Sequence, residues 1–279
     1  MVKIKNLSFG YGKEKLFSNL DFQLVPGNIY GLLGKNGVGK TTLLKLISGL
    51  RYPQDGECLV LHYIPQKRLP GMLEELYFIP EEFFVPPITM RTYEKIYAPF
   101  YPRFDRKALA EYMKEFDLDS KKKLTELSYG QKKKFLLAFG IATNCLHFLL
   151  DEPTNGLDIP SKSQFRKILA SALTDDRIIL ISTHQVRDME NLIDPIIILE
   201  DGQIIFNQYV QDISKHLIIQ MDHDLPGAED VLYSAKVLGG YAVVKKNRSG
   251  EESRMDLETL FNAVTTNRDK INELFSKEV

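Results

Sequence analysis

The sequence predicts an α/β fold with a mixed or mainly parallel central sheet, on two observations. Short, continuous apolar runs at residues 146–150 and 177–182 have the length of strands that are covered on both faces. Residues 160–173, which lie between them, have the apolar spacing of a helix. Buried strands that alternate with helices are typical of a parallel sheet flanked by helices.

The N-terminal part predicts antiparallel strands that precede a loop and a helix. Residues 2–8 and 20–25 alternate between apolar and polar side chains with a period of two, as half-buried strands do. An apolar run at residues 28–34 ends in glycine, and residues 40–50 then show helical spacing. The predicted order is therefore strand, glycine-containing loop and helix.

The rest of the chain predicts a helical insert and a small C-terminal unit. Further strands are expected at residues 57–64 and 76–80, after which helical spacing dominates from about residue 83 to 145. Near the C-terminus, short strands are followed by two amphipathic helices. We therefore expect a main domain at residues 1–208 and a small α+β accessory domain at residues 209–279.

Charge and composition restrict the class of protein. The 279 residues are 44% hydrophobic and 26% charged, which is ordinary for a globular protein. The net charge is −1, so no overall basic field indicates direct binding of nucleic acid. Two lysine clusters, at residues 121–123 and 132–134, are interpreted as solvated faces.

Cysteine use and hydropathy indicate a cytoplasmic protein. Cys58 and Cys145 fit neither a metal-ligand spacing nor a disulfide framework, and both lie in apolar runs, as buried reduced thiols do. The N-terminus lacks the apolar core of a signal peptide. Because no apolar stretch approaches the roughly 18 residues of a membrane span, we expect any membrane role to come through a partner.

A phosphate-binding loop is predicted at Gly34–Thr41. The segment GKNGVGKT fits the pattern G-x-x-x-x-G-K-[ST] and lies between a predicted strand and a predicted helix. Its glycines allow backbone N–H groups to surround phosphates. Lys40 can place a positive charge on the β- and γ-phosphates, and the Thr41 hydroxyl can bind Mg²⁺. The loop therefore predicts a nucleotide site.

Two adjacent carboxylates follow the apolar run at residues 146–150. Asp151 stands where the predicted strand ends, a position suited to holding Mg²⁺ directly or through water. Glu152 beside it can polarise an attacking water as a general base. Together with the phosphate loop, this pair predicts hydrolysis of the bound nucleotide.

A helix N-terminus is predicted at LSYGQ, residues 127–131. Ser128 can cap the helix, and Gln131 can close a capping box. The first N–H groups of such a helix lack internal partners and can bind an anion. Tyr129 is bulky for a phosphate site, so we expect only its backbone to matter and its ring to point to solvent or to a facing subunit. Tyr129→Gly is accordingly expected to keep substantial activity.

These motifs together resemble one family, the ATP-binding subunits of ABC transporters, which are P-loop NTPases. GKNGVGKTT resembles Walker A, LSYGQ the signature and FLLDEP Walker B. Tyr11 resembles the aromatic residue that stacks on adenine, NGLD at 155–158 the D-loop, and His184 in STH the switch histidine. The resemblance covers about residues 1–206, with the motifs in the family's order.

In this family, two subunits close head to tail around two ATP molecules. The resemblance implies that Ser128, Gly130 and Gln131 cover the γ-phosphate of the ATP held by the other subunit. Asp158 would bridge the dimer, while Glu152 and His184 would be catalytic. The nucleotide-binding residues that it implies are Tyr11, Asn36, Gly37, Val38, Gly39, Lys40, Thr41 and Thr42.

Mg²⁺ and its ligands are also implied by the resemblance. The metal ligands are Thr41, Asp151 and a residue at the hinge into the helical insert, where the family has glutamine about 40 residues after the Walker lysine. Gln66 lies only 26 residues after Lys40 (66 − 40), whereas Glu81 lies 41 residues after it (81 − 40), so we take Glu81 as the counterpart of that glutamine. A glutamate there still offers oxygen to Mg²⁺ but adds negative charge. We expect it to change both Mg²⁺ affinity and coupling.

The leading hypothesis is an ATPase that powers transport through separate transmembrane permease subunits. Such a protein would be cytoplasmic and peripheral to the inner face of the membrane. The hinge at residues 81–82, the segment that follows it and the predicted helix at residues 255–264 resemble exporting members more than importing ones. Two alternatives remain: a soluble ABC ATPase that acts on nucleic acid or ribosomes, and a regulatory nucleotide-binding module without turnover.

Overall fold

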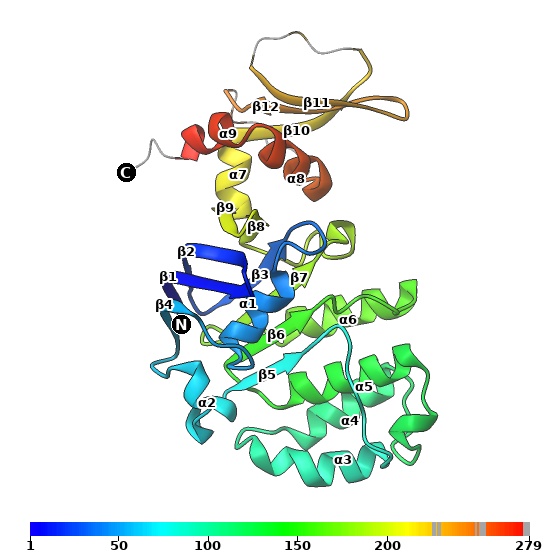
Figure 1. The fold of residues 1–279 in the computed structure, drawn as a ribbon. Helices are drawn as coiled ribbons and strands as arrows, with labels where there is room; N and C mark the ends of the chain where they lie inside the picture. Colours follow the sequence, from blue (N-terminus) through cyan, green and yellow to red (C-terminus); the bar gives the residue numbers. More distant parts are fainter. Residues whose placement is uncertain (225–226, 228–229, 249, 251–254, 276–279) are drawn as a thin grey trace.

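A six-stranded sheet forms the centre of the computed structural model, which describes residues 1–224, 227, 230–248, 250 and 255–275. The strand order is β5-β6-β7-β3-β8-β9, with the first five parallel and β9 antiparallel to β8 (Figure 1). These strands are β3 (Asn28–Leu33), β5 (Leu76–Ile79), β6 (His147–Asp151), β7 (Ile178–Thr183), β8 (Ile196–Glu200) and β9 (Gln203–Gln208). The predicted mixed, mainly parallel sheet is confirmed.

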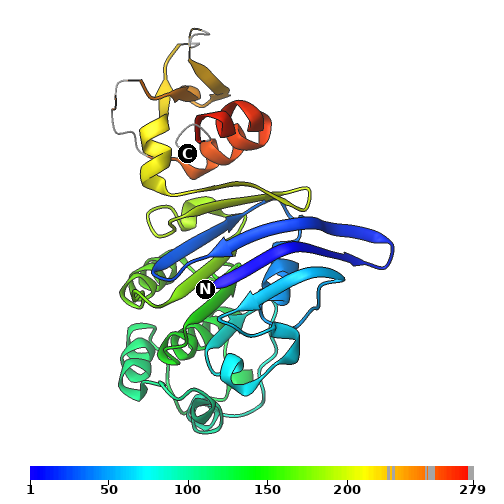
Figure 2. The same ribbon diagram turned by 90° about the vertical axis from the view of Figure 1, so that its left-hand side faces the viewer.

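A separate antiparallel sheet is built from the N-terminal segment. Its strands are β1 (Val2–Tyr11), β2 (Glu14–Leu24) and β4 (Asp55–Val60), in the order β2-β1-β4 (Figure 2). Apolar side chains alternate into its core, as the period-two pattern predicts. The strand predicted at residues 57–64 ends earlier, because Leu61 has a φ of +59° that a strand does not accommodate.

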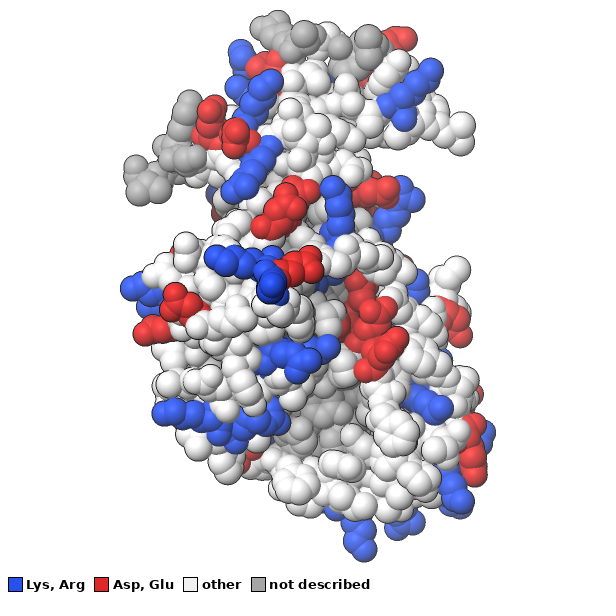
Figure 3. Space-filling model, viewed as in Figure 1, with Lys and Arg blue, Asp and Glu red and all other residues white. Residues whose placement is uncertain are grey.

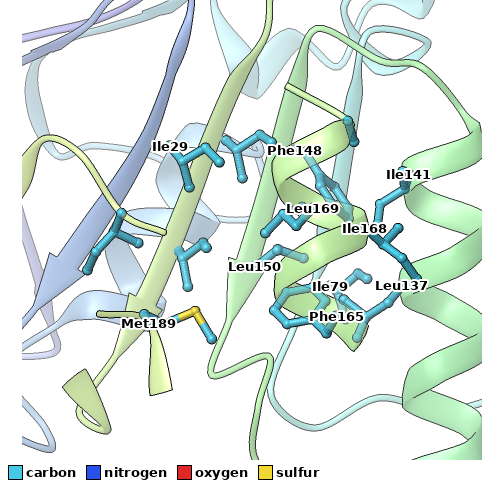
Figure 4. Close-up of a cluster of buried hydrophobic side chains, with 14 of the residues drawn as sticks. Ile29, Ile79, Leu137, Ile141, Phe148, Leu150, Phe165, Ile168, Leu169 and Met189 are labelled. Atoms are coloured by element: carbon cyan, nitrogen blue, oxygen red, sulfur yellow. The ribbon is translucent and has the colours of Figure 1, made fainter. Parts of the chain in front are cut away.

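Helices cover both faces of the central sheet. α1 (Lys40–Ile47) packs between the antiparallel sheet and one face of the central sheet, in a shared core with Leu32 and Leu180. α5 (Tyr129–Ala142) and α6 (Ile159–Ser171) cover the opposite face (Figure 4). The helix expected within residues 40–50, with Gly49 near its end as a stop, ends at Ile47, and Gly49 has a φ of +69°.

The helical insert lies below the central sheet in Figure 1. It contains α3 (Met90–Tyr97), α4 (Arg106–Glu115) and α5, close to the predicted segments. The short helix α2 (Pro70–Leu73) precedes it and was not predicted, because four residues carry too little periodicity. An aromatic cluster around Phe139 joins α5 to the other parts of the insert.

The described C-terminal residues form a third, antiparallel sheet with three helices, next to the β9 end of the central sheet (Figure 1). Its elements are α7 (Val210–His216), β10 (Leu217–Asp222), β11 (Val231–Val237), β12 (Gly240–Lys246), α8 (Leu257–Thr266) and α9 (Arg268–Phe275). Only α7 was not predicted; residues 276–277 of the last predicted helix lie outside the described residues. The division into domains at residue 208 remains a prediction.

The described helices include no candidate membrane span, and the face seen in Figure 3 carries no field of one charge. None of the described helices is long and apolar enough to cross a bilayer. On the face seen in Figure 3, basic and acidic side chains are interspersed. This face therefore lacks the continuous basic stripe of a nucleic-acid-binding surface.

Candidate active site

The carboxyl ends of β3, β6 and β7 meet at one edge of the central sheet. Leu33 pairs with Thr183, and Asp151 pairs with Ser182, in a parallel register. Parallel strands place the loops that follow them side by side, which is where α/β proteins bind ligands. The phosphate loop, the acidic pair and the switch histidine therefore converge, although they are far apart in the chain.

The phosphate loop has the backbone shape that its glycines allow. Gly37 and Gly39 have φ values of +81° and +110°, which disfavour other residues. A Cβ on Gly39 would lie 2.8 Å from the Phe17 ring, so the loop also packs closely against β2. Gly39 caps α1, which directs the free N–H groups of the first turn into the loop.

Lys40 is buried at the start of α1. Its Nζ donates to the carbonyl oxygens of Gly34 at 2.6 Å and Lys35 at 3.1 Å. It also lies 3.9 Å from the Oε1 atom of Glu152. Burial lowers the pKa of Lys40, and the carboxylate of Glu152 opposes that shift. The lysine is thus positioned to contact phosphate next to the expected general base.

Oxygen atoms suited to Mg²⁺ meet beside Lys40. The Thr41 hydroxyl donates to Oδ2 of Asp151 at 2.7 Å, and the Ser182 hydroxyl donates to Oδ1 of the same carboxylate. Within the described residues, no cluster of three or more His, Cys, Asp or Glu side chains could hold a metal alone. That arrangement fits Mg²⁺, which keeps waters and takes substrate phosphate oxygens as further ligands. Ser182 was not among the predicted site residues.

Glu152 and His184 form a hydrogen-bonded pair. Oε1 of Glu152 accepts from the backbone N–H of His184 at 3.0 Å and lies 2.7 Å from its Nδ1. Thr183 Oγ1 donates to Oε2 at 3.1 Å, so both carboxylate oxygens are held. Glu152 has a φ of +46°, an uncommon backbone conformation that is found at functional sites. Thr183 precedes His184 in the STH motif but was not predicted.

A cavity of about 420 Å³ joins these groups. It is lined by Tyr11, Glu14, Leu16, Asn36, Gly37, Gly39, Lys40, Thr41, Thr42, Glu81, Glu152 and His184. Nearly all the nucleotide-binding residues that were expected thus border one space. Val38 differs, because it packs against the core between the sheets and does not line the cavity.

Tyr11 stands at the open side of this cavity. Its side chain is 48% exposed, and its hydroxyl lies 3.2 Å from Oγ1 of Thr42. The Phe9 ring packs edge-on against it, with centroids 5.1 Å apart. A face of the Tyr11 ring is therefore available for a flat ligand such as adenine.

Of the two hinge candidates, Glu81 is at the cavity and Gln66 is not. Oε1 of Glu81 accepts from Nδ2 of Asn155 at 2.8 Å. Gln66 lines a separate cavity of about 200 Å³ near β4. The geometry therefore favours Glu81 as the hinge residue.

The predicted signature residues lie outside the cavity. Ser128 Oγ accepts from the Gln131 N–H at 3.2 Å, and Gln131 Oε1 accepts from the Ser128 N–H at 3.1 Å. These two bonds form the capping box that the sequence predicts. Asp158 caps α6 by accepting from the Ser161 N–H at 2.8 Å. Gly130 is also absent from the lining. In a single subunit these groups therefore do not reach the nucleotide pocket.

Two expectations about the start of α5 were wrong. The Tyr129 ring does not point only to solvent or to a facing subunit, because its hydroxyl donates to the Glu81 carbonyl oxygen at 2.6 Å. Lys133 is not part of a solvated face, because its side chain is fully buried. The local sequence holds no signal for either contact, since both partners are distant in the chain.

Comparison with known proteins identifies the family. The ABC transporter family model matches residues 17–155. The ABC transporter ATP-binding protein YtrB of Bacillus subtilis is 29% identical over 80% of this chain and 77% of its own. The Nod factor export ATP-binding protein I of Rhizobium etli is 32% identical over 78% of this chain and 71% of its own length. The SkfA peptide export ATP-binding protein SkfE of Bacillus subtilis is 30% identical over 75% of this chain and 90% of its own length.

Solved structures show the same fold. The ATP-binding subunit of an ABC transporter superposes with a TM-score of 0.71 and 24% identity, over 76% of this chain and 91% of that one. The ATP-binding cassette MJ0796, solved as a dimer with ADP and Pi, superposes with a TM-score of 0.66 and 24% identity, over 75% and 99%.

The fold and the cavity define a P-loop protein that binds and hydrolyses a nucleotide. The relatives narrow this class to one family. The chain belongs to the ATP-binding proteins of ABC transporters, and it is an ATPase of that type.

Proposed function

We propose that two copies of this chain close head to tail around two MgATP and power export through separate transmembrane subunits. The observation that carries the proposal is the pair of Glu152 and His184, held beside Lys40 on one cavity. A carboxylate that is fixed at both oxygens next to a phosphate-binding lysine suits the activation of a water for attack on phosphorus.

Some residues of the cavity would bind the phosphates and Mg²⁺, and Glu152 would accept the proton of the attacking water. Backbone N–H groups of the phosphate loop and Nζ of Lys40 hold the phosphates, and Lys40 would exchange its two carbonyl partners for phosphate oxygens. Thr41 and Asp151 would hold Mg²⁺, which, when bound, neutralises charge on the phosphates. Glu152 orients the water and accepts its proton.

His184 holds the general base and faces the reacting phosphate. While its Nδ1–H donates to Glu152, its Nε2 is the remaining ring nitrogen. That tautomer fixes the ring direction, as a partner on one nitrogen does for the other. We infer that loss of the γ-phosphate changes the His184–Glu152 contact and so reports hydrolysis.

A second copy supplies the groups that the cavity lacks. Ser128 and Gly130 lie outside the pocket of their own subunit, yet Ser128 begins a helix whose first N–H groups can bind an anion. A twofold dimer would place this helix start over the ATP of the other copy. The dimeric form of MJ0796 supports this arrangement.

Export and membrane attachment are supported by the named relatives. Two relatives that are at least 30% identical bear names for Nod factor export and peptide export. The described part of this chain has no helix that could span a bilayer, so it would attach to the cytoplasmic face of a membrane through permease subunits.

The enzymatic proposal is tested with Glu152→Gln and the matched control Glu57→Gln, which changes an exposed glutamate on β4. Glu152→Gln should lose ATPase activity about 100-fold or more, and it should dimerise on addition of MgATP because hydrolysis no longer opens the interface. Light scattering reports the dimer. Wild-type turnover no faster than that of Glu152→Gln, or a variant that stays monomeric at saturating MgATP, would overturn the proposal.

The transport proposal needs a membrane partner. Affinity purification of the chain from detergent-solubilised membranes should recover a polytopic membrane protein in a fixed ratio. Reconstituted with that protein in vesicles, the ATPase should move cargo away from the side that holds the chain. Movement toward that side would contradict export.

A further inference from the structure

The start of α5 contacts two parts of its own subunit's ATP site. Ser128, its cap, is expected to reach the ATP of the partner subunit, whereas Tyr129 and Lys133 are bonded within their own subunit. We propose that Tyr129 and Lys133 are positioning residues that couple occupancy of one ATP site to the hinge and catalytic loop of the other. This inference rests on the proposed homodimer.

Tyr129 connects the signature turn to the hinge. Its hydroxyl donates to the Glu81 carbonyl oxygen at 2.6 Å, and its ring stacks on Phe83 with centroids 5.2 Å apart. On the other side, a Cβ on Gly156 would lie 2.7 Å from the ring. The ring thus fills the space between the hinge and the loop after Glu152, and only its hydroxyl bonds to the hinge.

Lys133 connects the same helix to the catalytic loop. Its Nζ donates to the carbonyl oxygens of Glu152 at 2.6 Å and Asn155 at 3.1 Å, and it lies 5.6 Å from the centre of the Tyr129 ring. Burial lowers the pKa of Lys133 to about 8, opposed by nearby carboxylates. A buried cation needs such partners, so α5 and the Glu152 backbone are joined firmly.

A fourth hydrogen bond joins the catalytic loop to the hinge. Asn155 Nδ2 donates to Oε1 of Glu81 at 2.8 Å, while the Asn155 carbonyl oxygen accepts from Lys133. Glu81 is therefore held through both its backbone and its side chain. Tyr129 and Lys133 are four residues apart and share one face of a rigid helix. A shift of the helix start on binding the partner's phosphate would move the hinge and the Glu152 backbone together.

The test compares two variants with two matched controls. Tyr129→Phe keeps the ring and removes only the hydroxyl, and Lys133→Met keeps most of the volume and removes the cation. The controls are Tyr209→Phe, an exposed tyrosine, and Lys132→Met, the partly exposed lysine beside Lys133. ATPase rate is measured against ATP concentration for the Hill coefficient, kcat and KM, and thermal unfolding is measured in parallel.

Coupling predicts a loss of cooperativity, which a merely structural role would not produce. The wild type should have a Hill coefficient well above 1, with two as the limit set by two sites. The Hill coefficients of both variants should fall toward 1. The kcat of Tyr129→Phe, which loses one hydrogen bond, should be lower by about three- to tenfold, and that of Lys133→Met, which loses two, should fall at least as far. MgATP-dependent dimerisation, measured in a Glu152→Gln background, should persist, and the controls should match the wild type.

The outcomes separate this inference from the proposed function. A wild type that does not hydrolyse ATP, or a Glu152→Gln protein that stays monomeric with MgATP, contradicts the proposed function itself. A wild type that hydrolyses ATP without cooperativity, while Glu152→Gln does dimerise, overturns only the coupling, as does a Tyr129→Phe variant that keeps the wild-type Hill coefficient and kcat. If Lys133→Met fails to fold, Tyr129→Phe still decides the matter, because it leaves the packing in place.

Discussion

The Tyr129 hydroxyl lies 2.6 Å from the carbonyl oxygen of Glu81 and donates a hydrogen bond to it. Both residues depart from the motifs that the sequence resembles: Tyr129 is a bulky residue within the signature, where the family commonly has glycine, and Glu81 stands where a glutamine is expected at the hinge. The two departures are therefore in direct contact. Their contact suggests that they act together.

Tyr129→Gly is expected to lower ATPase activity, the reverse of what the sequence alone predicts. The change removes the bond to Glu81 and the ring that packs against Phe83, and glycine adds backbone freedom at the first turn of α5. Together these losses should cost about 1–2 kcal/mol of stability. Activity should fall about tenfold.

ATPase assays and thermal unfolding of Tyr129→Gly and Tyr129→Phe separate the effect of the lost hydrogen bond from the effect of the lost ring. The phenylalanine variant should unfold near the wild-type temperature while losing cooperativity. A glycine variant with wild-type turnover would show that only the backbone at residue 129 matters.

Glu81→Gln should raise the Mg²⁺ concentration needed for half-maximal ATPase activity. The glutamine keeps an oxygen that can accept from Asn155 Nδ2, so the hinge geometry is retained. It removes one negative charge from the wall of the cavity, which weakens attraction for the cation by about 1 kcal/mol, or roughly fivefold in concentration.

Titration of Mg²⁺ at fixed ATP measures this effect. The matched control is Glu82→Gln, which changes the exposed neighbour and should leave the curve in place. Equal Mg²⁺ curves and equal turnover for wild type and Glu81→Gln would contradict a role of this carboxylate at the metal.

Local patterns predict most of the fold, and contacts between distant residues account for what they miss. The phosphate loop, the acidic strand end and the capping box of α5 each lie within a few residues, so their spacing is visible in the sequence. Lys133 looks like its neighbours in a run of three lysines. Only the loop after β6, folded against α5, makes it a buried donor to Glu152 and Asn155.

The same limit applies to Ser182 and Tyr129. Ser182 lies in an apolar strand, and its bond to Asp151 depends on the register between β6 and β7. The Tyr129 hydroxyl bonds to the Glu81 carbonyl oxygen because the fold brings the hinge against the start of α5. Neither pairing has a local periodic signal, since each joins segments more than 30 residues apart.

His147 should make the protein sensitive to acid. It is buried at the start of β6, away from the cavity, and burial lowers its pKa to about 4 from the ordinary 6.5. The unfolded chain therefore binds more protons than the folded one between pH 6.5 and 4, so stability falls as pH falls through that window. The total effect is about 3 kcal/mol.

His147→Leu should remove this loss while keeping the burial. Urea unfolding of both proteins at pH 7 and pH 4.5 measures the difference, and the wild type should lose more stability than the variant on acidification. An equal loss in both proteins would show that His147 is not responsible. The ATPase rate at neutral pH should be unchanged, because the residue is remote from the site.

Ser128→Arg should abolish ATPase activity while leaving ATP binding to the single subunit intact. Ser128 lies outside the cavity that holds Lys40 and Thr41, so the first binding step does not use it. An arginine at this position removes the cap and places a bulky side chain where the partner's phosphate is expected, so it should block closure of the dimer. Lys40→Ala, in contrast, should lose both ATP binding and hydrolysis.

Fluorescent ATP titration measures binding, and phosphate release measures turnover. Ser18→Arg on the exposed face of β2 serves as the control for the added side chain. Equal loss of ATP binding in Ser128→Arg and Lys40→Ala would place Ser128 in its own subunit's site and contradict the head-to-tail arrangement.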